Sequence, residues 1–556
     1  MLAAALVLLP VALGAPSAAC PALEQGSLQA EEVQHTHSSE LGPVSSGESC
    51  EKYLNDLPPL VGRANSCSSS AAVSDAPMVA KVSSKYLILE EMRHLEVDFE
   101  ITRGIQLQQA LRKPGLWLWP SHYRNTDRSS ALWQSMTTVR SFDIFLSHTW
   151  CTPGRWKILS LLMQFGWPHA LTFWSIGVSV MAYLRWQLLV PGWGNYMLTS
   201  RGVTYECSHS PWIIISGWVS LVIGLMVSPY LPLRTTFCFF DIASIHQSDE
   251  DLKERGIYSI GGFLSVSNEL RILWSRPYFS RLWCLFEIAA FRKANPRGQI
   301  VFKPLFVERA VAFLICMFFL FSLTDMVLSI YIEDDRELKN LWWELFAVFS
   351  PVFPLVHVAR CNYREKARLL NDLKRFELDD VSCNSFFDTR FIHAAIDHWY
   401  GSKEAFRDFV RGPLREELRG TSRQLDPSYV MMSISSTAAW LVETSVALKH
   451  GGADGLSILS YALCWSSFAL FWAWSLLTGI IYLSEKTSAP CTTRLVDWLL
   501  TCTVASAALA WTGVGVALCI VVSQAKTMWA PIGLFTCSMS LPCLGQWLGH
   551  SWPAAV

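Results

Sequence analysis

Long apolar stretches alternate with polar sequence along this 556-residue chain. A helix needs roughly 20 apolar residues to cross the hydrocarbon core of a bilayer. The clearest stretches of about that length are 211–233, 310–331, 456–483 and 495–522. Four weaker ones are 168–190, 341–359, 429–448 and 528–548. Hydrophobic residues make up 51% of the chain and charged residues only 16%, which excludes an ordinary soluble protein. The sequence predicts a multi-pass membrane protein in contact with the lipid bilayer.

The polar sequence between the first stretches has the pattern of alternating strands and helices. We expect strands at 141–148, 235–242, 270–275 and 300–307, the last at a sheet edge because it contains Pro304. We expect helices at 155–165, 257–266 and 281–291, with Gly166 ending the first of them and a polar loop at 243–256. Strands that alternate with helices predict a parallel α/β sheet.

This pattern gives the domain organisation. We interpret residues 1–77 as a disordered leader with a signal-like start, and 78–140 as a segment of uncertain structure. The α/β domain comprises 141–166 and 235–307, and 167–234 is a hairpin of two spans inserted into it, with a polar loop at 191–210. Two further spans at 308–359 are followed by an amphipathic helical block at 360–427 and by a bundle of about four spans at 428–556. Two spans return the chain to the side it left. The two parts of the α/β domain can therefore form one sheet, in which we expect the strand at 142–148 to pair beside the strand at 235–242.

Charge distribution predicts which side of the membrane the α/β domain occupies. Basic residues follow the stretch 341–359, whereas 333–335 before it is acidic, so the positive-inside rule places the basic side in the cytosol. Arg155 and Lys157 precede the first span and favour the same side for the sheet. The run Leu2–Leu13 resembles a signal peptide and favours the lumen. We give the loop charges more weight and predict a cytosolic α/β domain in a membrane of unspecified identity.

Composition argues against several classes of site. A formal net charge of -1 gives no electrostatic basis for nucleic-acid binding. The 16 cysteines include no CxxC pair and many lie in apolar stretches, so we expect neither a disulfide framework nor a metal site.

Asp325, Glu443 and Asp497 lie in or near apolar stretches, where a charged residue indicates a transport pathway or a helix-pairing role.

Two short runs carry a family resemblance. Residues 142–148 (FDIFLSH) resemble the first conserved box of the Toll/interleukin receptor (TIR) domain, and 280–288 (SRLWCLFEI) are similar to the WCL-x-E signature of plant and many microbial TIR domains. The resemblance covers about 142–166 and 235–307. It implies a flavodoxin-like parallel sheet, here interrupted by a transmembrane hairpin and followed by a helical transmembrane bundle.

The resemblance implies signalling through self-association of the domain, or cleavage of NAD to nicotinamide and ADP-ribose or a cyclic product. Glu287 occupies the place of the catalytic glutamate, whose carboxylate would stabilise an oxocarbenium-like ribose. NAD would be the substrate, and no further cofactor is expected. The residues expected to contact NAD are Ser147, His148, Thr149, Trp150, Asp241, Trp283 and Cys284.

Several of these residues also have a structural interpretation. Glu287 is compatible with an ordinary surface glutamate, Trp283 and Cys284 with packing, and Asp241 with the cap of a turn. The loop at 243–256 lacks the Pro-Gly pattern of many receptor TIR domains, which argues against receptor-style adaptor pairing. Two other functions stay open: a non-catalytic interaction module, and a channel or transporter with a TIR-like sensor domain.

Overall fold

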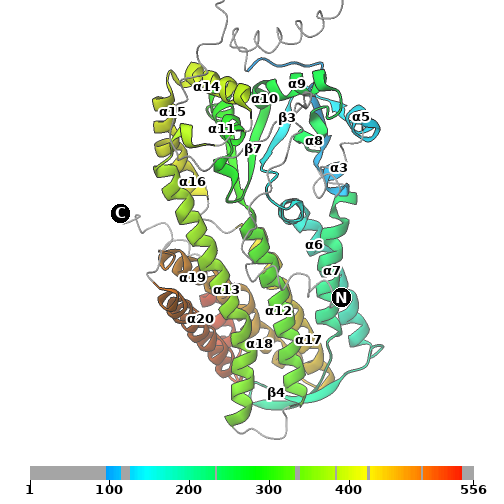
Figure 1. Cartoon of the computed structure of the whole chain (residues 1–556). Coiled ribbons are helices and arrows are strands. Elements are labelled where there is room, and N and C mark those ends of the chain that lie inside the picture. Colours follow the sequence, from blue (N-terminus) through cyan, green and yellow to red (C-terminus); the bar gives the residue numbers. More distant parts are fainter. Residues whose placement is uncertain are drawn as a thin grey trace, which may run out of the picture. The chain divides into compact units, whose positions relative to one another are not determined.

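The computed structural model describes residues 95–113, 126–231, 235–331, 338–381, 383, 385–421, 426–489 and 493–540 (Figure 1). The expected leader at 1–77 lies outside the described residues. The described part contains a mixed α/β region and a set of long apolar helices, and several helices belong to both (Figure 1).

One mixed sheet organises the α/β region, in the strand order β2-β1-β6-β3-β7-β8. Its strands are β1 (Arg103–Gln106), β2 (Thr137–Thr138), β3 (Phe142–His148), β6 (Phe237–Phe239), β7 (Ser267–Trp274) and β8 (Gln299–Pro304). β3 pairs in parallel with β6 and β7, β7 pairs in parallel with β8, and β1 adds to β6 in the antiparallel sense. Ile144 lies opposite Cys238, which confirms that the strand at 142–148 pairs beside the one at 235–242.

Helices cover both faces of the sheet, which explains why β3 is apolar along most of its length. On one face, Phe145 stacks on Phe239 with 4.3 Å between ring centroids. On the other face, Ile144 and Leu146 belong to a second buried cluster with Leu161. The covering helices are α3 (Leu107–Arg112), α5 (Thr126–Gln134), α6 (Gly154–Trp186), α8 (Asp241–Ser244), α9 (Glu250–Tyr258), α10 (Ile260–Ser265) and α11 (Leu282–Ala294).

Several predicted boundaries of the α/β region are corrected. β6 is shorter than predicted, because Asp241 begins α8 instead of closing the strand. The expected loop at 243–256 contains most of α9, whose first turn is capped by the carboxylate of Asp249. β1 comes from the segment 78–140, which was assigned no strand. The edge position predicted for the strand containing Pro304 is confirmed.

α6 is a single helix that passes the expected stop at Gly166. Gly166 serves close packing instead: a Cβ at this position would lie 2.5 Å from the Oγ atom of Ser228, which follows α7 (Trp212–Val227). Farther along, the Ser216 hydroxyl donates a hydrogen bond of 2.9 Å to the carbonyl of Gly177. Small residues let two helices approach closely in this way. The predicted polar loop at 191–210 is a β-hairpin formed by β4 (Gly194–Ser200) and β5 (Val203–His209).

Among the described residues, four helical segments are long and apolar enough to cross a membrane: Trp212–Tyr230, Leu305–Thr324, Gly455–Lys486 and Arg494–Ser523. They coincide with the four clearest stretches of the sequence. They lie in α7, α12 (Leu305–Tyr331), the continuous run from α18 (Gly455–Ser466) to α19 (Ala473–Lys486), and α20 (Arg494–Ser523). The weaker stretches are helical where they are described and stay predictions as spans; they lie in α6, α13 (Leu338–Lys374), α17 (Pro427–His450) and α21 (Trp529–Ser538).

The block at 360–427 is helical, as predicted, but its first helix is the continuation of α13. It also contains α14 (Phe386–Tyr400), α15 (Lys403–Phe409) and α16 (Arg415–Thr421). Phe286 of α11 packs on Trp399 with ring centroids 5.5 Å apart, and both belong to the core of the sheet. The block is therefore part of the packing of the α/β region.

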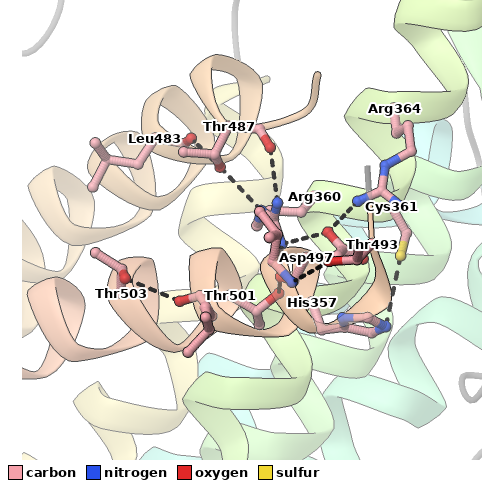
Figure 2. Close-up of polar contacts among 12 residues, drawn as sticks. His357, Arg360, Cys361, Arg364, Leu483, Thr487, Thr493, Asp497, Thr501 and Thr503 are labelled. Carbon is pink, nitrogen blue, oxygen red and sulfur yellow. Dashed lines mark hydrogen bonds and ion pairs between the residues drawn. The ribbon is translucent and has the colours of Figure 1, made fainter. Parts of the chain in front are cut away.

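A buried arginine joins α13 to the junction of α19 and α20 (Figure 2). The guanidinium of Arg360 donates to the carbonyls of Thr487 (2.8 Å) and Asp497 (2.6 Å) and to the hydroxyl of Thr501 (2.6 Å). The carboxylate of Asp497 accepts from both Arg360 and Arg364. The Thr487 carbonyl lies just past the end of α19, where helix carbonyls have no partner within the helix. Asp497 thus pairs helices, one of the two roles expected for it.

We expect Arg360→Lys to lower the free energy of unfolding by about 2 kcal/mol, because an ammonium group cannot reproduce the divergent bonds of a planar guanidinium. Denaturant titration in detergent, followed by tryptophan fluorescence, measures this change. The matched control is Arg368→Lys, since Arg368 is exposed and bonds only Glu365 in the described contacts. Equal effects of the two substitutions would contradict the proposed role of Arg360.

A second buried polar cluster joins α6, β5 and α17. Arg185 Nη2 lies 3.4 Å from Glu443 Oε1, and the two side chains are 1% and 0% exposed. The backbone N–H and the hydroxyl of Ser210 each donate to the same Glu443 oxygen at 2.9 Å. Arg185 also donates to the carbonyls of Val190 and Ser208. The acidic residue that weakened the stretch 429–448 in the sequence is therefore an internal ion-pair partner.

Candidate active site

The strand order reverses at the centre of the sheet. Of the parallel strands, β3 comes first in the chain, β6 follows on one side of it, and β7 follows on the other. Open α/β sheets bind ligands outside the carboxyl ends of the strands at the point where the order reverses. Ser147 and His148 end β3, Asp241 follows β6, and Tyr278 and Glu287 follow β7. Residues distant in the sequence thus converge on this point.

Glu287 and Ser147 are in direct contact at this point. The Ser147 hydroxyl donates a hydrogen bond to Glu287 Oε2 and also bonds the hydroxyl of Tyr278. Because the proton of Ser147 is used toward Glu287, Tyr278 is the donor in the second bond. Burial raises the pKa of Tyr278 well above its ordinary value, which keeps its donor proton in place. The chain Tyr278–Ser147–Glu287 holds the carboxyl at one orientation.

The surroundings of Glu287 change its protonation. Its side chain is half-buried, and loss of hydration raises its pKa from 4.5 to about 8; the Ser147 hydrogen bond opposes this rise, and the charge of Asp241 adds to it. The folded protein therefore keeps a proton on Glu287 that the unfolded chain has lost between pH 4.5 and about 8. Across that interval this group makes folding less favourable as the pH rises.

A second group of contacts surrounds Asp241 on the β6 side of β3. The indole N–H of Trp150 donates to Asp241 Oδ2 at 2.7 Å, and His148 Nε2 lies 4.0 Å from Asp241 Oδ1. Burial, with the nearby charge of Lys157, lowers the pKa of His148 well below its ordinary value, so the contact with Asp241 joins a neutral imidazole to the carboxyl. The rings of His148 and Trp150 meet edge to face at 4.7 Å. Asp241 keeps 36% of its side chain exposed and can meet a ligand.

Lys157 was missed as a site residue and had been counted only among the basic residues before the first span. Its side chain is fully buried, and its ammonium nitrogen lies 4.6 Å from the centre of the Trp150 ring without a hydrogen-bond partner. Burial lowers its pKa to about 7, although the charge of Asp241 opposes the change. A signal was available: Lys157 precedes Leu161 by four residues and therefore shares its buried helix face.

The structure brings most of the other predicted site residues to the same place. Thr149 is buried, and its hydroxyl accepts the N–H of Cys151. Cys284 is buried, with its sulfur 4.0 Å from the carbonyl oxygen of His148. Trp283 is the exception, because its indole N–H donates to Asp388 of α14 and its ring packs on α14. In the part of the chain that the structure describes, no group of three or more His, Cys, Asp or Glu side chains is placed to hold a metal ion.

Comparisons with protein-family models, with curated proteins and with solved structures found no match to this chain. The chemistry of the site is therefore inferred from its own geometry. The Glu287 carboxyl is bonded by the Ser147 hydroxyl, which in turn bonds Tyr278, and it lies near a partly exposed aspartate and aromatic rings. Such a carboxyl can stabilise a developing cation next to a flat heteroaromatic group. Glu287, Ser147 and Asp241 are the residues best placed for such a role.

Proposed function

We propose that the chain is a membrane protein whose α/β region is a TIR-like domain that cleaves the bond between nicotinamide and ribose in NAD. The observation that carries the proposal is the contact between Ser147 and Glu287. These residues come from the two runs that resemble TIR motifs, and they meet at the reversal point of the strand order. A packing or surface role alone does not explain why Glu287 lies at this position.

The reaction consumes water: NAD and water give nicotinamide, ADP-ribose and a proton. As the bond breaks, both of its electrons leave with the nicotinamide nitrogen, and positive charge develops on the ribose. The ionised carboxylate of Glu287 stabilises this charge and accepts hydrogen bonds from the ribose hydroxyls. Ser147 and Tyr278 keep the carboxylate in place, and Trp150 offers an aromatic surface beside Asp241.

We further propose that this domain lies on the cytosolic face of a membrane. α6 and α7 would form the inserted hairpin, and α12, α13 and the C-terminal helices would form the bundle. The four apolar helices and the basic residues beyond 359 support this arrangement. Arg360 and Arg364 form ion pairs with Asp497. The excess of positive charge that predicts the cytosolic side therefore comes mainly from the other basic residues beyond 359.

The direct test incubates the purified full chain, in lipid nanodiscs, with NAD and follows release of nicotinamide by liquid chromatography. We expect nicotinamide and an ADP-ribose product to appear in equal amounts. Failure to release nicotinamide over a range of pH and protein concentration would overturn NAD cleavage. The non-catalytic interaction module would then become the better interpretation of the domain.

The pH dependence of the reaction follows from the pKa of Glu287. Because the carboxylate form acts, kcat/KM for NAD should rise with pH and level off above about 8. Ser147→Ala removes the hydrogen bond that lowers this pKa, so the midpoint should move to higher pH. Ser275→Ala is the matched control, since the Ser275 hydroxyl bonds Thr152 at the same edge of the sheet. A midpoint that stays unchanged in Ser147→Ala would argue against Glu287 as the titrating group.

A further inference from the structure

A cavity of about 150 Å³ lies where β8, α12, α13, α17 and α19 meet. Its walls change character along the helices. Glu308 of α12 and Lys366 of α13 line the end near the sheet, whereas Leu314 and Leu355 of the same helices line it farther away. The contact between Arg276, which follows β7, and Glu365 places this part of α13 beside the sheet. The cavity is thus polar at one end and apolar at the other.

Glu308 is one of the residues at the polar end, and one of its two carboxyl oxygens has no hydrogen-bond partner among the described residues. Its side chain is 1% exposed. Its Oε1 atom accepts hydrogen bonds from the Tyr429 hydroxyl at 2.7 Å and the Gln164 amide at 3.1 Å. Its Oε2 atom is buried and has no hydrogen-bond partner. Leaving a buried carboxyl oxygen without a donor is costly, so this position calls for a ligand group that donates a hydrogen bond.

The charges around the cavity favour a neutral ligand. Lys303 and Asp426 both line it and form an ion pair of 3.6 Å. Glu308 and Lys366 add one acidic and one basic side chain. An ionised phosphate or amine would upset this balance in a cavity with mainly apolar walls, whereas a hydroxyl would not.

We propose that this cavity binds the hydroxyl end of an uncharged membrane lipid, of the sterol or the acylglycerol class. The hydroxyl donates to Glu308 Oε2, and the apolar part lies against the Leu314 and Leu355 side of the cavity. A cavity of about 150 Å³ accommodates a group of about the size of benzene, so the rest of the lipid extends along the helices. Because α12 and α19 lie within apolar segments long enough to cross a bilayer, the membrane is the source of the ligand. This inference is independent of NAD cleavage.

The test uses the full chain in nanodiscs and two photoreactive probes, a sterol and a diacylglycerol, each compared with its own O-methyl ether. The ethers keep the shape of the lipids but cannot donate a hydrogen bond. We expect one of the two alcohols to label peptides of α12 or α13 about tenfold more than its ether does. The alcohol that labels identifies the class of lipid. Equal labelling by alcohol and ether, or labelling only outside the cavity, would overturn the proposal.

Two substitutions sharpen this test. In Glu308→Gln the amide oxygen stays with Tyr429 and Gln164, so an N–H replaces the free acceptor, and the preference for alcohol over ether should disappear. Ala359→Phe fills the cavity and should abolish labelling, whereas Leu320→Phe on the exposed face of α12 should not. Undiminished labelling in folded Ala359→Phe protein would contradict the site. If this variant does not fold, the comparison of alcohol and ether in the unaltered chain decides alone.

Discussion

Glu287→Gln should reduce kcat for nicotinamide release by about 1,000-fold or more, with little change in the affinity for NAD. The amide keeps the size of the side chain and can still accept the hydrogen bond from Ser147. In the proposed reaction, it removes the negative charge that stabilises the ribose cation. Since the carboxylate acts mainly in the transition state, its loss should affect kcat far more than KM.

Glu269→Gln provides the matched control for this substitution. Glu269 is a half-buried glutamate on β7 of the same sheet, paired with Arg271 and two residues into the strand, far from its carboxyl end. We expect this variant to keep nearly normal activity. If both glutamine variants lose activity equally, the loss reflects damage to the fold, and Glu287 has no specific role. If neither loses activity, the proposed chemistry is wrong.

We expect Glu443→Leu to lower the free energy of unfolding by about 3–5 kcal/mol, because it leaves the charge of Arg185 buried without its counter-charge. The partners that remain, the carbonyls of Val190 and Ser208, satisfy hydrogen bonds but not the charge. Denaturant titration of the protein in detergent micelles measures the effect. Arg185→Met should be destabilising in the same way.

The double variant Arg185→Met/Glu443→Leu distinguishes a coupled pair from two separate packing defects. Removing both charges removes the need for compensation, so the double variant should be more stable than either single variant. If the destabilisation of the double variant equals the sum of the destabilisations of the two single variants, the two side chains act independently. That result would contradict the pairing of α6 with α17 through this cluster.

The parts of the fold predicted correctly share one physical property, a continuous run of apolar residues. β3 is apolar because it is covered on both faces, and the four clearest apolar stretches form the helices long enough to cross a membrane. The parallel pairing of β3 with β6 agrees with the expectation that the inserted segment 167–234 does not separate the two parts of the sheet. These predictions needed no knowledge of side-chain contacts.

The errors arose where distant contacts decide the local structure. Gly166 was interpreted as a helix stop from its conformational freedom, but its small size at the approach of Ser228 accounts for it. β1 has few residues and pairs with β6, which is far away in the sequence, so no local pattern reveals it. The β-hairpin at 194–209 is polar and exposed along much of its length, and it therefore resembled a loop.

Prediction of the candidate site was partial for the same reason. Motif resemblance singled out Glu287 and Ser147, and the two lie in contact. The two motif runs include neither Lys157 nor Tyr278. Tyr278 lies in the connection after β7 and bonds Ser147. Trp283 was chosen with its motif neighbours, but its contacts are to α14. A motif identifies residues close in sequence, whereas the packing of each side chain decides which of them meet.

The insertion between β3 and β6 has a consequence for biosynthesis. The chain emerges from the ribosome at about 5–20 residues per second, so β3 is synthesised several seconds before its partners β6 and β7. During that interval α6, the β4–β5 hairpin and α7 must be made, and α6 and α7 must enter the bilayer if they form the proposed hairpin. The sheet can then close only after its membrane anchor is in place. Failure of membrane insertion would leave β3, an apolar strand with two unpaired edges, exposed to aggregation and to the quality-control machinery of the cell.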